Sequence, residues 1–228
     1  MSDNKQKEAM VKKVKQVLVV GACVLFVVLM ILSGMSSHWL SIFTVIKPGD
    51  RVVVDYTLYD INGNPLLTSN QQTYMQVTAK SQNIILSRQL SVTAGQKLTK
   101  SIYPVSIYTS SSGWTKEYAL FSVEFDAINE ALIGMRAGDQ KRIRIPNSSM
   151  TQVWSAAQLT NNGVNIEDLI TGDILAMGVS DEPELLATNN TTTYTRVGQV
   201  TSKTTDSVIV NFGYPSADIS IVAINANS

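Results

Sequence analysis

The stretch "EALIGMRAGDQKRIRIP", residues 130–146, decides the fold, because a helix, a turn and a strand follow one another in it. Its first half continues a short helix predicted over residues 126–135. Asp126 can cap the start of this helix, and Gly134 can end it. The apolar residues of the helix recur at i, i+3, i+4 and i+7, as Ile128, Ala131, Leu132 and Met135.

Four basic residues crowd into the same stretch and raise the question of a binding patch: Arg136, Lys141, Arg142 and Arg144. The segment "QKRIRIP" alternates like a strand, with Lys141, Ile143 and Ile145 on one face and the arginines on the other. Arg136 falls in the turn, and the apolar stem of Lys141 can lie along the surface. The pattern therefore predicts the solvent face of a strand and not a ligand site.

Further strands surround this stretch. "RVVVDYTLYD" (51–60) alternates and runs into the tight-turn pair Asn62-Gly63, while "SVIVNF" (207–212) and "DISIVAI" (218–224) are two more strands. Three Gly-Asp pairs stand just before strands: Gly49-Asp50, Gly138-Asp139 and Gly172-Asp173. These pairs predict a positive φ at the glycine and hydrogen bonds from the turn backbone to the aspartate. With so little helix, the body is predicted to be α+β.

Two more segments complete the body. Residues 70–119 are interpreted as strands, beginning with "TYMQVTA", and predict an added β-rich insertion. This insertion either carries a partner surface or is an elaboration without function. Residues 148–159 are a second candidate helix, with Ser148 or Ser149 as its cap.

The N-terminal region differs from the rest, since no Asp, Glu, Lys or Arg occurs from Gln16 to Ile46. Its apolar run "VLVVGACVLFVVLMILSGM" is long enough to cross a bilayer. We expect a basic cytoplasmic tail at residues 1–15, a transmembrane anchor at 16–40 and the body outside the cytoplasm, as a single-pass cell-membrane protein. The alternatives are a cleaved signal peptide and a lipoprotein signal that uses Cys23.

Composition excludes several classes of function. The body after residue 15 is slightly acidic, which gives no reason to expect nucleic-acid binding. His38 is the only histidine, so a histidine metal site or a Ser-His-Asp triad is not expected. Cys23 is the only cysteine and lies in the predicted anchor, so no disulfide is expected in the body. We expect no metal and no cofactor.

In their order along the chain, "VVVDYTLYDINGNPLLTS" and "EALIGMRAGDQKRIRIP" resemble the FKBP family of peptidyl-prolyl isomerases. The family's segments look like a strand ending "HYTG", a "DG" turn, "F-D-S" and "EGLxGMxxGEKxxxxIPP". The tail from "IEDLITGDILAMGV" to "ADISIVAI" is similar to the SlyD-type branch, in which a small chaperone domain follows the Ile-Pro strand. The resemblance covers roughly residues 47–69 and 120–224.

The resemblance implies an FKBP-like antiparallel half-barrel around one short helix. This domain would comprise residues 46–164 and 205–228, with the insertion 70–119 added to it. Residues 165–204 would form the inserted β-rich, chaperone-like domain of the SlyD type, the insert-in-flap domain.

Carried over position by position, the family's proline pocket falls on Tyr56, Leu66, Leu67, Phe125, Ile128 and Ile221. Tyr56 keeps the pocket tyrosine, whereas Leu66 and Leu67 replace a phenylalanine and an aspartate. The pair whose backbone N–H holds the proline carbonyl falls on Glu124 and Phe125. Catalysis in the family needs no acid or base, because an apolar pocket takes in a twisted Xaa-Pro amide. These positions therefore either only fill a core or form a weakened isomerase pocket.

Two functions stay open. In the first, the chain is a membrane-tethered FKBP/SlyD-like isomerase and folding chaperone that acts on unfolded or proline-containing polypeptides. Ile170, Leu175 and Met177 would then hold unfolded segments. In the second, the chain is a non-catalytic FKBP-like accessory or scaffold subunit of a larger membrane protein complex. The match to both domains slightly favours the first function, and Leu67 in place of the aspartate favours the second.

Overall fold

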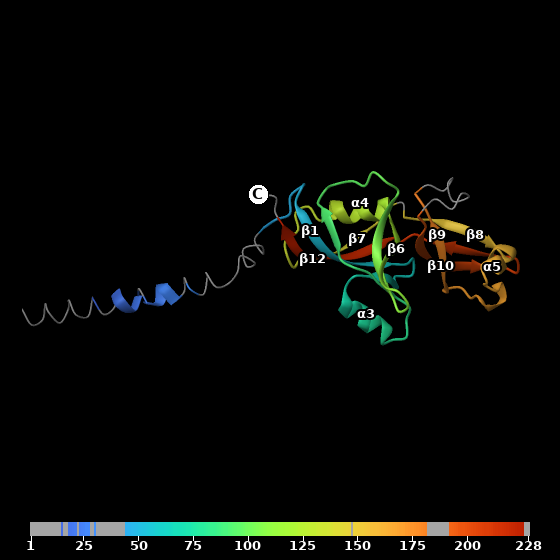
Figure 1. The fold of residues 1–228 in the computed structure, drawn as a ribbon, viewed down its shortest axis with the longest axis horizontal. Helices are drawn as coiled ribbons and strands as arrows, with labels where there is room; N and C mark the ends of the chain where they lie inside the picture. Colours follow the sequence, from blue (N-terminus) through green and yellow to red (C-terminus); the bar gives the residue numbers. More distant parts are fainter. Residues whose placement is uncertain are drawn as a thin grey trace, which may run out of the picture. The chain divides into compact units, whose positions relative to one another are not determined.

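The chain is described from a computed structural model, at residues 44–146, 148–181 and 192–225 and at residues 15, 18–21, 23–27 and 30. It divides into two compact units, Met1–Phe43 and Thr44–Ser228. The described residues of the first unit are helical (Figure 1). All strands named below belong to the second unit.

The predicted N-terminal anchor at residues 16–40 and the predicted tail at 1–15 lie mostly outside the described residues. In the part of the chain that the structure describes, no helix is long and apolar enough to cross a membrane. A crossing helix needs about 20 consecutive apolar residues, and the described helical runs are far shorter. This finding contradicts the predicted transmembrane helix and the predicted single-pass location.

The second unit is α+β and rich in strands. Its strands are β1 Arg51–Tyr59, β2 Pro65–Thr68, β3 Ile85–Leu86, β4 Leu90–Thr93, β5 Ile102–Thr109, β6 Gly113–Phe121, β7 Gln140–Arg144, β8 Thr151–Ser155, β9 Ile174–Val179, β10 Tyr194–Lys203, β11 Ser207–Asn211 and β12 Ser216–Asn225. Its helices are α3 Gln71–Thr78, α4 Ser122–Ala131, α5 Ala156–Asn161 and the short 3₁₀ helix η1 Ile166–Asp168. The strands predicted within residues 51–60, 207–212 and 218–224, and in "QKRIRIP", are therefore confirmed as β1, β11, β12 and β7.

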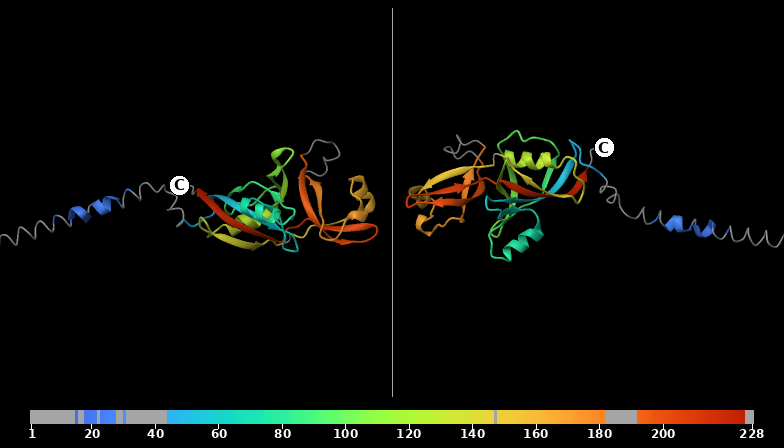
Figure 2. Two further views of the ribbon diagram at one scale, coloured as in Figure 1. Left: turned by 90° about the horizontal axis from the view of Figure 1, so that it is seen from below. Right: turned by 180° about the vertical axis from the view of Figure 1, so that it is seen from behind.

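The strands form two mixed sheets. The first has the order β3-β2-β1-β12-β7, with β4 also paired to β1, and the second has the order β5-β6-β10-β11-β8, with β9 paired to β10. Most pairs are antiparallel, but β2 pairs with β3 in parallel, and so does β6 with β10. The antiparallel half-barrel of the prediction is thus corrected to two mixed sheets. Helix α4 lies against β5, β6 and β7 (Figures 1 and 2).

Two groups of buried apolar side chains hold the unit together. The larger group, here called the first core, lies between the first sheet, α4 and the β5–β6 hairpin. The smaller group, the second core, draws on residues between Met150 and Phe212 and lies under β8–β11 and α5. The second core therefore takes in residues on both sides of the predicted insert at 165–204.

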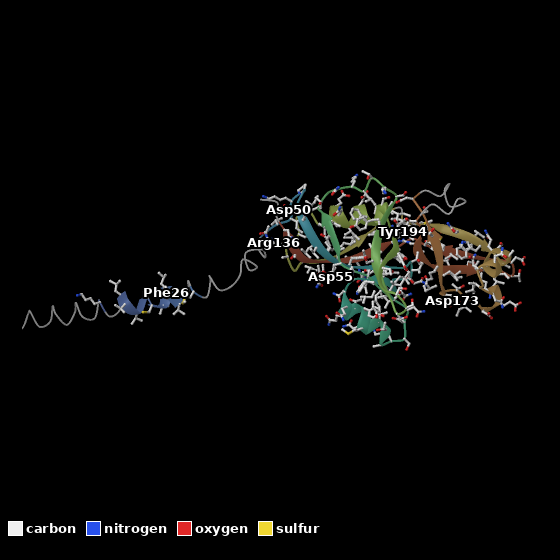
Figure 3. The ribbon with its side chains drawn as sticks, viewed as in Figure 1. Phe26, Asp50, Asp55, Arg136, Asp173 and Tyr194 are labelled. Atoms are coloured by element: carbon white, nitrogen blue, oxygen red, sulfur yellow. The ribbon has the colours of Figure 1, made fainter. Side chains whose placement is uncertain are left out.

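The three Gly-Asp turns behave as the sequence predicts. The φ angles of Gly49, Gly138 and Gly172 are +95°, +85° and +105°. In each turn the aspartate carboxylate accepts a hydrogen bond from the backbone N–H three residues earlier, at 2.8 Å, 2.8 Å and 2.7 Å for Asp50, Asp139 and Asp173. Figure 3 shows two of these carboxylates, those of Asp50 and Asp173, at different ends of the second unit.

Helix α4 begins four residues before the predicted start. The backbone N–H of Phe121 donates to Glu124 Oε2 at 3.0 Å, so that Glu124 and not Asp126 satisfies the first turn. The carboxylate of Asp126 instead accepts the backbone N–H of Leu98 at 2.8 Å. Gly134 has a φ of +86° beyond the end of the helix.

Two segments have a different secondary structure from the one predicted. "TYMQVTA" is not a strand but part of α3, where the side chain of Asn70 accepts the N–H of Thr73 at 3.0 Å and caps the helix. The predicted helix at 148–159 is β8 followed by α5, because Ser155 and Gln158 form a capping box in the middle of the segment.

Candidate functional site

The six residues of the predicted proline pocket come together in the structure. They belong to β1, β2, α4 and β12 and all lie in the first core: Tyr56, Leu66, Leu67, Phe125, Ile128 and Ile221. The least buried of them, Phe125, is only 6% exposed. These positions form one cluster whose residues are almost completely buried, and Tyr56 alone among the six also lines the polar groove described below.

The β5–β6 hairpin covers this cluster. Four of its side chains belong to the same core, namely Val105, Ile107, Tyr118 and Leu120. Beside them the ring centroid of Tyr103 lies 4.6 Å from that of Phe125. All of the hairpin except the last two residues of β6 lies in the predicted insertion 70–119, so the insertion packs against the residues that the resemblance assigns to proline binding.

Tyr56 shows how completely the cluster is closed. Its side chain is 1% exposed, and its hydroxyl has no hydrogen-bond partner among the described residues. The hydroxyl of Ser87 lies nearby but also lacks a partner in hydrogen-bonding geometry. Burial raises the pKa of Tyr56 far above its usual value, and it outweighs the opposite effect of the Ser87 hydroxyl. Tyr56 is therefore a neutral, buried phenol.

A buried ion pair lies at the edge of the same cluster. The guanidinium of Arg196, on β10, pairs with the carboxylate of Glu124, on α4, and both side chains are almost completely buried. Arg196 Nη1 donates to Glu124 Oε2 at 2.8 Å and to the carbonyl of Ala119 at 2.9 Å. Its Nε and Nη2 donate to the carbonyl of Phe212 at 3.0 Å and 2.7 Å. The pair thus joins α4, β6, β10 and the end of β11.

Aromatic rings surround the guanidinium of Arg196. Its central carbon lies 3.8 Å from the ring centroid of Tyr214 and 4.4 Å from that of Phe121. The hydroxyls of Tyr214 and Tyr118 are hydrogen-bonded to each other, and the hydroxyl of Tyr214 also donates to the carbonyl of Val197 at 2.8 Å. Burial raises the pKa of both tyrosines, so they stay neutral.

Two features of the sequence indicate this network. Glu124 stands where the family resemblance expects an apolar residue, and Arg196 is the only charge in the apolar stretch "YTRVGQV". A charge at a core position needs a partner of opposite sign. The resemblance assigns a backbone N–H of the pair Glu124 and Phe125 to a proline carbonyl, whereas the side chain of Glu124 here binds Arg196.

The three residues predicted to hold unfolded segments differ in how far solvent reaches them. Ile170 is 67% exposed in the turn before β9. Leu175 is 7% exposed inside the second core, and Met177 packs against that core. Only Ile170 of the three presents an apolar side chain to solvent.

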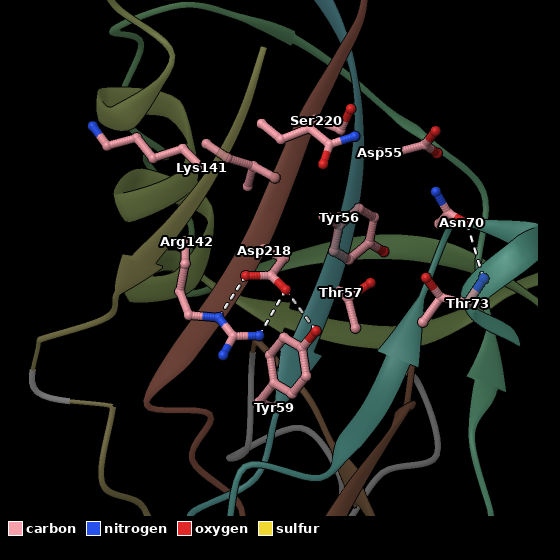
Figure 4. Close-up of a pocket in the computed structure, with 12 residues that line it drawn as sticks. Asp55, Tyr56, Thr57, Tyr59, Asn70, Thr73, Lys141, Arg142, Asp218 and Ser220 are labelled. Carbon is pink, nitrogen blue, oxygen red and sulfur yellow. Dashed lines mark hydrogen bonds and ion pairs between the residues drawn. The ribbon is translucent and has the colours of Figure 1, made fainter. Parts of the chain in front are cut away.

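A polar groove of about 310 Å³ crosses the outer face of the first sheet (Figure 4). Asp218 lies at its centre and binds Arg142 at 2.6 Å and 2.7 Å through two nitrogens, and the hydroxyl of Tyr59 at 2.7 Å. The hydrogen bonds from Arg142 are the main cause that lowers the pKa of Asp218. Burial, followed by Asp218, raises the pKa of Tyr59 to about 12. Arg142 and Tyr59 both donate hydrogen bonds to Asp218. This group therefore stabilises the sheet, and none of its three members is a free acid or base.

Within the described residues, no three side chains of His, Cys, Asp or Glu lie close enough together to hold a metal ion. No protein-family model matches the chain, and a search of the curated proteins finds no match either.

Proposed function

We propose that this protein binds other polypeptides without isomerising them, on a frame that resembles FKBP and has a filled proline pocket. One observation carries the proposal: all six carried-over pocket residues are at most 6% exposed beneath the β5–β6 hairpin. FKBP-like catalysis, as the resemblance implies it, needs an apolar groove that an Xaa-Pro segment can enter. A core filled by the chain's own hairpin leaves no room for that segment.

The free energy needed to open the hairpin supports the same proposal. Val105, Ile107, Tyr118 and Leu120 are each at most 5% exposed. Re-exposing an apolar side chain costs about 1.5–3 kcal/mol, so the four together cost roughly 6–12 kcal/mol. At about 1.4 kcal/mol per factor of ten, fewer than about one molecule in 10⁴ would have the hairpin open.

A peptide-isomerisation assay on the full chain tests the proposal. We expect no acceleration over the uncatalysed exchange of an Xaa-Pro bond, which takes tens to hundreds of seconds. The matched variant is Tyr56→Phe, which keeps the packing and removes the hydroxyl. A rate well above background in the natural chain would overturn the proposal.

The second candidate function is a weak isomerase whose hairpin moves aside. It is favoured by the hydroxyl of Tyr56, which is buried without a partner, at a cost of about 1–3 kcal/mol. A group left unsatisfied in the closed state could find its partner in a bound peptide. The same assay separates the candidates, since an active isomerase should lose rate in Tyr56→Phe.

A further inference from the structure

A groove of about 630 Å³ lies between α4 and β7, at the margin of the first core, to which Ile143 belongs. Its apolar lining comes from Val123, Ala127 and Ala131 on the helix and from Ile143 on the strand. Val123 is 40% exposed and presents an apolar side chain at the mouth of this groove. The groove does not include any of the carried-over proline-pocket residues.

Strand β7 forms one wall of this groove and is the last strand of the first sheet. It pairs with β12, and no other described strand pairs with it. The N–H of Ile145 donates to the carbonyl of Pro215 at 2.8 Å, and the N–H of Ile221 donates to the carbonyl of Asp139 at 2.9 Å. In an antiparallel pair, every second residue exchanges its backbone hydrogen bonds with the partner strand. These two bonds place Asp139 and Ile145 among the residues that bond to β12. Gln140, Arg142 and Arg144 therefore direct their N–H and C=O groups away from β12. An unpaired edge of this kind is a template for another strand.

We propose that this groove binds an extended segment of a partner polypeptide, which adds to β7 as a new edge strand and lies against α4. The inference rests on the proposed function, because it names where a polypeptide-binding protein would bind its partner. A strand beside an edge and under a helix gains main-chain hydrogen bonds from the edge and side-chain contacts from the helix.

Charge selects the sequence of that segment. Lys141, Arg142 and Arg144 make the edge basic, and only Arg142 has an ion-pair partner among the described residues. On the opposite wall Asp126 and Glu130 are acidic. Alternate side chains of an added strand point to opposite faces, so those that enter the groove should be apolar and those on the outer face, beside Arg144, should be acidic.

The same charges argue against self-association. If two copies paired through β7, lysine and arginine side chains of one copy would face those of the other, and like charges placed opposite each other destabilise a strand pair. A neutral or basic strand gains nothing from the edge charges. The occupant that fits is therefore a foreign strand in which apolar and acidic residues alternate.

The experiment uses the full chain and a fluorescein-labelled ten-residue peptide of alternating valine and glutamate, followed by fluorescence anisotropy at low salt. Arg144→Glu should weaken binding about tenfold or more, because it replaces an attraction by a repulsion. The matched control is Lys80→Glu, the same charge change on an exposed residue after α3, and it should leave the affinity within about twofold. Equal effects of the two variants would overturn the proposal.

Two further readouts do not depend on a variant. A peptide of the same composition with its valines and glutamates in two blocks should bind more weakly, as should alternating valine and lysine. Two further peptides are N-methylated at every second nitrogen, one at the odd and one at the even positions. One of them should lose binding and the other should keep it, because only one of the two sets of N–H groups faces β7. Equal binding of both N-methylated peptides would overturn strand addition.

Hydrogen exchange locates the bound peptide. The amides of Arg142 and Arg144 should exchange more slowly when the peptide is bound, and those of Ile143 and Ile145 should not change. Protection at another strand, or a dimer whose stability responds to Arg144→Glu, would overturn the inference and leave the proposed function untouched. Isomerase activity would overturn the proposed function, and the binding data would still stand.

Discussion

The two sides of helix α4 contrast sharply. One side carries Glu124, Phe125 and Ile128, all buried, and is closed by the β5–β6 hairpin and Arg196. The other side carries Val123 and Glu130, both exposed, and borders a groove beside the edge strand β7. The family resemblance points to the first side, whereas the solvent-accessible groove lies along the second. The surface of α4 that a partner could reach therefore lies beside the positions that the resemblance assigns to proline binding, and not at them.

The largest effect is expected from breaking the closed side. Glu124→Ala leaves the guanidinium of Arg196 buried without its carboxylate, which should lower the free energy of unfolding by about 3–5 kcal/mol. Urea denaturation followed by circular dichroism measures it. Glu130→Ala, on the exposed side of the same helix, is the control and should change stability by less than about 0.5 kcal/mol. Equal losses in the two variants would contradict the contrast.

Two matched variants test the tyrosines of the closed side. We expect smaller changes in the free energy of unfolding, of opposite sign in the two. Tyr56→Phe removes a buried hydroxyl that has no hydrogen-bond partner among the described residues and should stabilise the fold by about 1 kcal/mol. Tyr214→Phe removes a hydroxyl that bonds to Tyr118 and Val197 and should destabilise it by about 1–2 kcal/mol. Thermal unfolding measures both. A loss of stability in Tyr56→Phe would show that its hydroxyl has a partner in solution.

Local patterns in the sequence predicted the strands and turns of the frame. The alternation in β1 and β7 and the three Gly-Asp turns depend on neighbouring residues, and the structure confirms them. The start of α4 differs from the prediction, in which Asp126 is the cap, because Glu124 accepts the N–H of Phe121. Helix α3 differs because Tyr74 and Val77 favour strands, and the decisive signal was the cap at Asn70.

The closure of the site could not be predicted from local patterns. The six positions carried over by the resemblance all lie in the first core, but what covers them depends on contacts between distant residues. Tyr118 and Tyr214, which hydrogen-bond to each other, lie 96 positions apart, and Arg196 and Glu124 lie 72 apart. No periodicity in a single sequence links such positions. The inserted hairpin was predicted as strands, yet its place over the cluster follows only from the fold.

On the outer face of the first sheet, a pH effect of less than about 1 kcal/mol is expected, because the pair of Arg142 and Asp218 is partly exposed. The pKa of Asp218 is lowered in the folded state. Its contribution is therefore present above the usual aspartate pKa of about 3.9 and is lost as pH falls through the lowered value. Asp218→Asn should remove this part of the acid dependence of urea unfolding. An unchanged pH profile would show that the pair contributes nothing.

The smallest change in stability is expected at Val123, on the open side of α4. Because this side chain is 40% exposed, Val123→Ala should alter the free energy of unfolding by no more than about 0.5 kcal/mol.

If the groove binds an added strand, the same variant should weaken binding of the valine–glutamate peptide by about two- to fivefold. It removes roughly two methyl groups from the apolar wall, and the complex would bury these methyl groups only partly. Anisotropy titration measures the second effect and denaturation the first. The two sides of the helix should therefore differ in what a truncated side chain changes. On the closed side it should lower the free energy of unfolding, and on the open side it should lower only the affinity for the peptide. A variant at Val123 that unfolds the protein while binding is unchanged would remove that distinction.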